Sequence, residues 1–164
     1  MSTSPSVRDL HAQGFQQREW AVQIVGRILV ILLLLAAVLG LFGTGPLSHV
    51  RAEQGAVSVE YERFVRHTGH AQLEVRAPPP APGTSSVSVE ISGGLAAGMR
   101  MEDIQPQPAT VRRSGTSTEF VFAAVSDTDA LITFYYRPMD IGPQSATVTV
   151  ADAAAVDVWQ LTYP

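Results

Sequence analysis

One closely spaced histidine pair, His67 and His70, is the clearest metal-ligating pattern in this 164-residue chain. Two imidazoles at this spacing can bind copper or zinc when a further ligand lies nearby, and the candidates are Glu60, Glu62 and Met99. The pair also falls where the sequence predicts a turn between two strands. Solvated turn residues are therefore the alternative interpretation, and periplasmic copper or zinc handling through this pair is kept as the alternative function.

The composition argues against several other kinds of chemistry. The chain has no cysteine, which excludes disulfides, thiolate metal sites and thiol nucleophiles. It has no Gly-x-Ser-x-Gly nucleophile elbow, and its aspartates stand where turns are expected. A net charge of -4 does not favour nucleic acid, which needs a basic face. We therefore expect a chain that is not an enzyme, needs no cofactor and does not bind nucleic acid.

A long apolar run at residues 28–42 determines how the rest of the chain is organised. The run alone is shorter than the ~20 residues that cross a bilayer. The predicted transmembrane helix therefore extends back to Trp20 and comprises residues 20–43. From Trp20 to Phe42 this helix is roughly 34 Å long. Trp20 and Phe42 are expected at the membrane interfaces, and the side chain of Arg27 can extend to the headgroups. An ion pair between Arg27 and an acidic group of another subunit is the alternative.

The arginines predict the orientation of this helix. Arg8, Arg18 and Arg27 lie on its N-terminal side, whereas Arg51 is the first arginine after it. The positive-inside rule then places residues 1–19 in the cytoplasm as a tail. The C-terminal domain is expected on the periplasmic, extracytoplasmic side of a bacterial inner (cytoplasmic) membrane. A signal peptide cleaved near residues 50–52 is the alternative to this uncleaved signal-anchor.

Two small residues, Ala36 and Gly40, stand one helical turn apart in the predicted span. Small residues at this spacing let a second helix approach closely, so they predict a helix-packing face. Besides the lipid bilayer, the expected partner is another membrane protein or a second copy of this chain in a homo-oligomer.

The pattern changes after the predicted span. Residues 44–55 are expected to form a short tether, and from residue 56 apolar and polar side chains alternate with a period of two. Turn signals recur every 8–12 residues, which favours about eight short strands. We therefore predict an all-β fold for residues 56–164, a single antiparallel β-sandwich of immunoglobulin-like architecture. Its predicted core consists of Val59, Tyr61, Leu73, Val75, Val89, Ile91, Phe120, Phe122, Ile132, Phe134, Val148, Val150, Val158 and Trp159.

One N-terminal span followed by a β-sandwich resembles the copper-delivery assembly factors of cytochrome oxidase. That resemblance is one of topology, because those proteins hold copper through a cysteine pair and this chain has no cysteine. No residue role is taken from it. The function that the sequence favours is a non-catalytic accessory or interaction subunit of a membrane complex.

Overall fold

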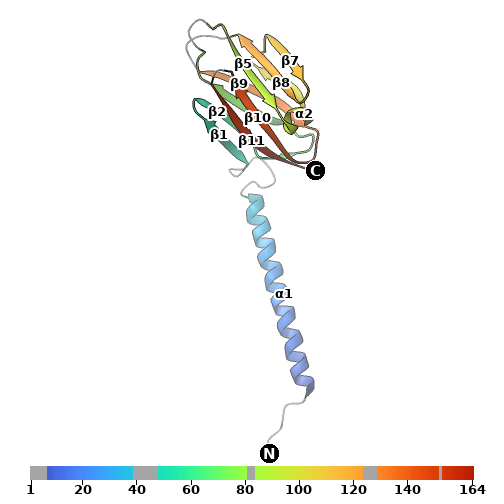
Figure 1. Cartoon of the computed structure of the whole chain (residues 1–164). Helices are drawn as coiled ribbons and strands as arrows, with labels where there is room; N and C mark the ends of the chain where they lie inside the picture. Colours follow the sequence, from blue (N-terminus) through green and yellow to red (C-terminus); the bar gives the residue numbers. More distant parts are fainter. Residues whose placement is uncertain (1–6, 39–47, 81–83, 124–128, 152) are drawn as a thin grey trace, which may run out of the picture. The chain divides into compact units, whose positions relative to one another are not determined.

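The computed structural model describes residues 7–38, 48–80, 84–123, 129–151 and 153–164 (Figure 1). The chain divides into two compact units, Met1–Leu39 and Gly40–Pro164. Each unit is described by itself below.

The first unit consists of one helix, α1 (Val7–Val38). It begins inside the segment that the sequence assigned to a cytoplasmic tail. Side chains are described for Trp20 and for residues 22–38, and most of them are exposed. In the part of the chain that the structure describes, no helix has the length and apolar character needed to cross a membrane. Residues 39–43 of the predicted span, including Gly40 and Phe42, lie outside the described residues.

The second unit contains two β-sheets. The first sheet has five strands in the order β1-β2-β4-β9-β6. Their bounds are β1 (His49–Gln54), β2 (Val57–Glu62), β4 (Ala71–Ala77), β9 (Ala130–Pro138) and β6 (Met99–Gln105). The second sheet has six strands in the order β3-β11-β10-β5-β8-β7. Their bounds are β3 (Phe64–Arg66), β11 (Ala154–Tyr163), β10 (Gly142–Val150), β5 (Ser86–Ser92), β8 (Ser117–Ala123) and β7 (Thr110–Ser114).

Almost all strand pairs are antiparallel, as the sequence predicted; β3 pairs with β11 in parallel. The predicted hairpin around residues 114–117 is formed by β7 and β8. Gly115 at its tip has φ 57°, a left-handed conformation that glycine adopts without steric cost. The unit is thus an all-β sandwich.

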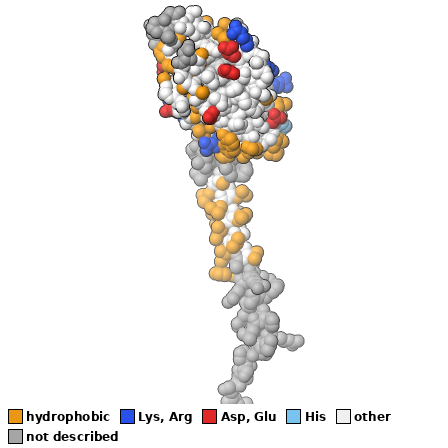
Figure 2. Space-filling view, viewed as in Figure 1, with side chains coloured by type: hydrophobic (Ala, Val, Ile, Leu, Met, Phe, Trp, Pro, Cys, Tyr) orange, Lys and Arg blue, Asp and Glu red, His pale blue; other side chains and the backbone are white. Residues whose placement is uncertain are grey.

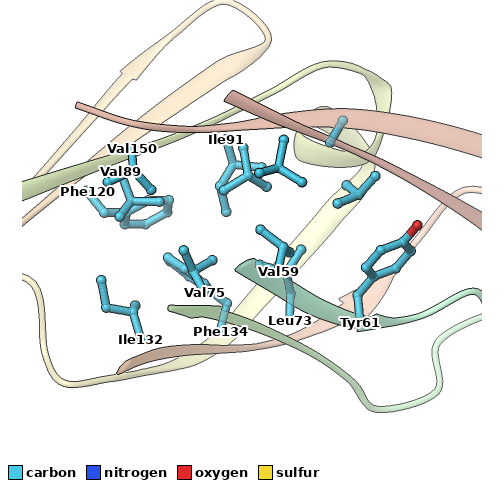
Figure 3. Close-up of a cluster of buried hydrophobic side chains, with 14 of the residues drawn as sticks. Val59, Tyr61, Leu73, Val75, Val89, Ile91, Phe120, Ile132, Phe134 and Val150 are labelled. Atoms are coloured by element: carbon cyan, nitrogen blue, oxygen red, sulfur yellow. The ribbon is translucent and has the colours of Figure 1, made fainter. Parts of the chain in front are cut away.

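The core lies between the two sheets, whose inward side chains point toward one another (Figure 3). Phe134 on β9 is 0% exposed and packs against Phe120 of β8, with ring centroids 5.0 Å apart. Phe122 contacts the same ring from a centroid distance of 6.3 Å. Aromatic contacts of this kind join the two sheets. Thirteen of the fourteen predicted core residues are buried.

Trp159 is the exception, because 42% of its surface is exposed. The predicted core included both Val158 and Trp159. The buried side chains of β11 are Val156, Val158, Gln160 and Thr162, so Val158 is confirmed and Trp159 is wrong. Polar Gln160 is accommodated because its Nε2 donates to the hydroxyl of Tyr136 and to the carbonyl of Glu62, both at 2.8 Å. Trp159 lies outside and meets Phe64 edge-on at a centroid distance of 6.5 Å.

Two further elements differ from the prediction. The expected tether at residues 44–55 contains β1, an edge strand that pairs with β2 along its whole length. Half-buried Val50 and Ala52 alternate with exposed residues in β1, but no side chain of this strand is fully buried. A short helix, α2 (Gly94–Gly98), buries Leu95 and connects to β6, where the sequence indicated only a crossing segment.

Candidate functional site

His67 and His70 lie in the turn between β3 and β4, as the sequence predicted, but their rings have separate partners. The Nε2 of His67 lies 3.1 Å from the carbonyl oxygen of Met139. The Nδ1 of His70 lies 2.9 Å from an oxygen of Glu102. The turn itself is tight, and Thr68 adopts φ 57°. The histidines therefore belong to two different contacts.

A surface cluster of His70, Glu102 and Arg137 results from three neighbouring strands. Glu102 stands at a bulge in β6, where the register with β9 shifts. Arg137, on β9, donates from Nε to Glu102 at 2.5 Å, and its Nη2 lies 3.2 Å from His70 Nε2. Burial raises the pKa of Glu102, but hydrogen bonds and charges from His70 and Arg137 outweigh that effect and leave it below its ordinary value. The Glu102 carboxylate thus accepts hydrogen bonds from both the His70 ring and the Arg137 guanidinium.

This arrangement does not favour a metal ion at His67 and His70. A carbonyl oxygen is only an acceptor, so the contact of His67 with Met139 places a proton on Nε2. His70 has one ring nitrogen against a carboxylate and the other against a guanidinium. Among the described residues, no three histidine, aspartate or glutamate side chains gather as a metal site.

A polar layer crosses one end of the core around Tyr136. Burial raises the pKa of the Tyr136 hydroxyl far above its ordinary value of 10. Burial also raises the pKa of Glu62, and the charge of His49 opposes this shift. The Oε1 of Gln160 and the Oγ1 of Thr162 are buried and without a hydrogen-bond partner in the described part of the chain. This layer is enclosed, so it is structural.

The sandwich is hollowed at both of its lateral openings. A cavity of about 220 Å³ lies between β6 and the β7–β8 hairpin, and its lining is mostly apolar, including Met99, Met101 and Phe120. A larger groove of about 670 Å³ lies on the opposite side. Strands β1 and β2 form one wall of this groove, and β10 and β11 form the other. We call it the β1–β11 groove.

Arg63 and Trp159 are the two large side chains of the β1–β11 groove that could contact a ligand. The groove is lined by Arg63, whose Nε is buried and finds no hydrogen-bond partner within the described residues. Trp159 is exposed there, and its backbone N–H donates to the hydroxyl of Tyr61 at 3.2 Å. The groove is therefore lined by an arginine with an unpaired, buried Nε and by a large exposed aromatic ring.

The residues predicted at the membrane lie on α1. Trp20 is 68% exposed, and Arg27 is exposed as well. Ala36 is half-buried, whereas its predicted companion Gly40 and the predicted interface residue Phe42 fall outside the residues that the structure describes. The helix-packing face therefore remains a prediction.

The sequence did not indicate Glu102, Arg137 or Arg63. Glu102 and Arg137 are more than 30 residues apart in the chain and meet only because β6 lies beside β9. Strand order of this kind is not encoded in local periodicity. Arg63 lies in the short bend between β2 and β3, and nothing in its neighbours distinguishes it from a solvated arginine.

No protein-family model and no curated protein sequence matches the chain. Among solved structures, a cohesin module of a family 33 glycoside hydrolase from Clostridium perfringens is 10% identical, with a TM-score of 0.46, over 66% of this chain and 96% of that one. A DUF4466 family protein from Parabacteroides merdae is 12% identical, with a TM-score of 0.42, over 68% and 45% of the two chains. An uncharacterized protein with an immunoglobulin-like fold from Nocardia farcinica is 14% identical, with a TM-score of 0.31, over 57% and 76%. The two sheets of the chain itself define the class, which is an all-β protein.

Proposed function

We propose that the chain is a single-pass, membrane-anchored accessory subunit whose β-sandwich lies on the extracytoplasmic side of a bacterial inner membrane. In this proposal the sandwich binds a membrane-protein partner or a second copy of the chain, and it performs no catalysis. The histidine pair is not assigned a metal, because its geometry favours separate hydrogen bonds.

The observation that supports this proposal most strongly is the exposure of α1. Twelve large apolar side chains between Trp20 and Val38 are 51–81% exposed, and consecutive residues from Ile28 to Leu35 are among them (Figure 2). Consecutive residues point in all directions around a helix, so the apolar surface has no polar side. Such a surface is stable only against lipid or other apolar helices. The apolar sequence continues to Phe42, which supports lipid as the main environment.

Membrane insertion is tested by placing charge in the middle of this helix. Replacing Leu32 and Leu33 by arginine costs about 2.5–3.5 kcal/mol per residue at a helix centre. The double variant L32R/L33R is therefore expected in the alkali-soluble fraction, whereas the natural chain stays in the alkali-resistant membrane pellet. The matched control L32V/L33V keeps the apolar surface and is expected in the pellet. A natural chain released by alkali would contradict the anchor.

Orientation is tested by a reporter fused after Pro164. Alkaline phosphatase is active only outside the cytoplasm, whereas green fluorescent protein exported in an unfolded state remains dark. An active phosphatase fusion with a dark fluorescent fusion is expected, because arginines predominate on the N-terminal side of the helix. The opposite pair of results would contradict the proposed location of the sandwich.

A further inference from the structure

Most of strand β11 has a neighbour on one side only. Its partner β3 covers only Leu161–Tyr163, whereas β10 runs along all of Ala154–Tyr163. Residues 154–160 therefore form an open sheet edge. An open edge presents unpaired backbone donors and acceptors to any strand that can reach it.

The hydrogen bonds of β3 show which residues of β11 face this edge. The N–H of Leu161 donates to the carbonyl of Arg63 at 2.7 Å, and the carbonyl of Tyr163 accepts from His67 at 2.6 Å. Backbone groups alternate in direction along a strand, so the odd-numbered residues face the β3 side. Ala155, Asp157 and Trp159 thus point their N–H and C=O groups to the open edge. The N–H of Trp159 already donates to the hydroxyl of Tyr61.

The open edge borders the β1–β11 groove, since Asp157, Val158 and Trp159 are among the residues that line it. The opposite wall is formed by Val50 and Ala52 of β1, both half-buried. A strand bound along Ala155–Trp159 would thus have apolar side chains on the far wall. Backbone pairing supplies affinity in such complexes, and side-chain pockets supply specificity.

Arg63 identifies the chemistry of the occupant. Its backbone is fixed by two hydrogen bonds, with its N–H donating to Ser48 and its carbonyl accepting from Leu161, both at 2.7 Å. Its Nε is buried and unpartnered in the described part of the chain. Leaving a buried charged donor without an acceptor is costly, and a carboxylate is the acceptor that matches a guanidinium best.

The negative charge must be placed at one end of the groove. Asp157 lines the same groove and accepts a hydrogen bond from Thr147 at 2.7 Å. A second carboxylate beside Asp157 would be repelled, so the occupant needs its acidic side chain near Arg63 and uncharged residues near Asp157. A continuous acidic run does not meet this requirement.

We propose that the β1–β11 groove binds an extended peptide segment of the partner, which adds as a strand to Ala155–Trp159 and places one carboxylate on Arg63. This inference rests on the proposed role as an interaction subunit and names its surface and ligand class. The partner's segment is uncharged except for the single acidic residue, and the side chain that it places next to Trp159 packs on the exposed indole.

The test uses the full chain in detergent micelles and two synthetic peptides. The first peptide is Thr-Val-Thr-Val-Glu-Val-Thr-Val, and the second has glutamine in place of glutamate. We expect the glutamate peptide to bind about tenfold more tightly, since a charge-assisted pair is stronger than a neutral one. Hydrogen exchange should slow at the amides of Ala155 and Asp157 when the glutamate peptide is present. Equal binding of the two peptides, or no binding, overturns the proposal.

Substitution of Arg63 separates this site from other edges of the sandwich. Arg63→Met is expected to abolish the preference for glutamate, whereas Arg113→Met, on the exposed strand β7, is expected to leave it unchanged. Protection of β7 or β1 amides in place of those of β11 overturns the assignment. The comparison of the two peptides on the natural chain needs no variant, so it remains decisive if Arg63→Met does not fold.

Failure of this inference can be distinguished from failure of the proposed function. An Arg63→Met chain that stays in the membrane, folds, and still co-purifies with a partner in the natural amount overturns only the peptide site. A natural chain that is released from the membrane by alkali overturns the anchored role, irrespective of peptide binding.

Discussion

The ionisation of Glu102 reports on the surface contacts that this residue makes with His70 and Arg137. Burial raises its pKa, but His70 and Arg137 outweigh that effect and lower the pKa below 4.5. A carboxyl group with a lowered folded-state pKa stabilises the fold above its unfolded pKa. This contribution is lost as the pH falls through the folded value. We therefore expect the ion pairs to support the fold at neutral pH and to fail in acid.

A carboxyl titration followed by NMR measures this shift. The midpoint of Glu102 is expected below its ordinary value in the natural chain and is expected to move upward in Arg137→Met, because a donor and a positive charge are removed. Arg112→Met is the matched control, since Arg112 pairs with Glu119 on β8. A midpoint of Glu102 that does not respond to Arg137→Met would contradict the cluster.

Substitutions of Phe134 and Trp159 test which of these two aromatic side chains lies in the core. Phe134→Ala is expected to lower the free energy of unfolding by about 3–5 kcal/mol, because a fully buried ring leaves a cavity. Trp159→Ala is expected to cost about 1 kcal/mol, because the indole is 42% exposed and contacts Phe64 at its edge. Urea denaturation of both variants measures the difference. Equal losses would place Trp159 in the core.

The error at Trp159 has a definite physical origin. The prediction placed both Val158 and Trp159 in the core, but neighbouring side chains of a strand point to opposite faces, so only one of the two can be buried. The true inner face contains Gln160, which is tolerated only because Tyr136 and Glu62 supply its partners from the other sheet. Those partners become visible only when the sheets are packed.

At the scale of elements, strands with one buried face were predictable, whereas the edge strands β1 and β6 were not. In β2, β4, β5, β8, β9 and β10 buried and exposed positions alternate or nearly alternate, so period two identifies them. β1 buries no side chain fully, and β6 fully buries only Ile104. In both edge strands most of the alternation is between half-buried and exposed positions, so their period-two signal is weak. The cluster of Glu102 could not be foreseen because it depends on β6 lying beside β9.

Proline substitutions test the assignment of the open edge of β11. Ala155→Pro removes an N–H that faces the open edge, so it is expected to cost about 1 kcal/mol or less. Val156→Pro removes an N–H that faces β10 and is expected to cost at least about 3 kcal/mol more than Val156→Ala. Thermal or urea unfolding measures both costs. A severe loss in Ala155→Pro with tolerance of Val156→Pro would reverse the assignment.

At the scale of the whole molecule, the chain combines a helix that exposes a run of apolar side chains at Ile28–Leu35 with a sandwich that has two lateral hollows. The sequence predicted the sandwich because period-two alternation is a local signal, whereas the predicted membrane span stays a prediction. It could not predict the hollows, which form between strands distant in the chain. The proposed partner contacts follow from these two kinds of surface. In the proposed function the helix provides membrane association, and the sandwich provides recognition of the partner.

The most direct test of the accessory role is purification of the tagged full chain from membranes in a mild detergent, followed by native mass spectrometry. We expect a defined complex with a membrane-protein partner, or with a second copy of the chain, in fixed stoichiometry. The variant A36L/G40L, which enlarges the small residues of the predicted packing face, is expected to stay in the membrane and to lose most of this complex. Recovery of the natural chain only as a free monomer would contradict the account.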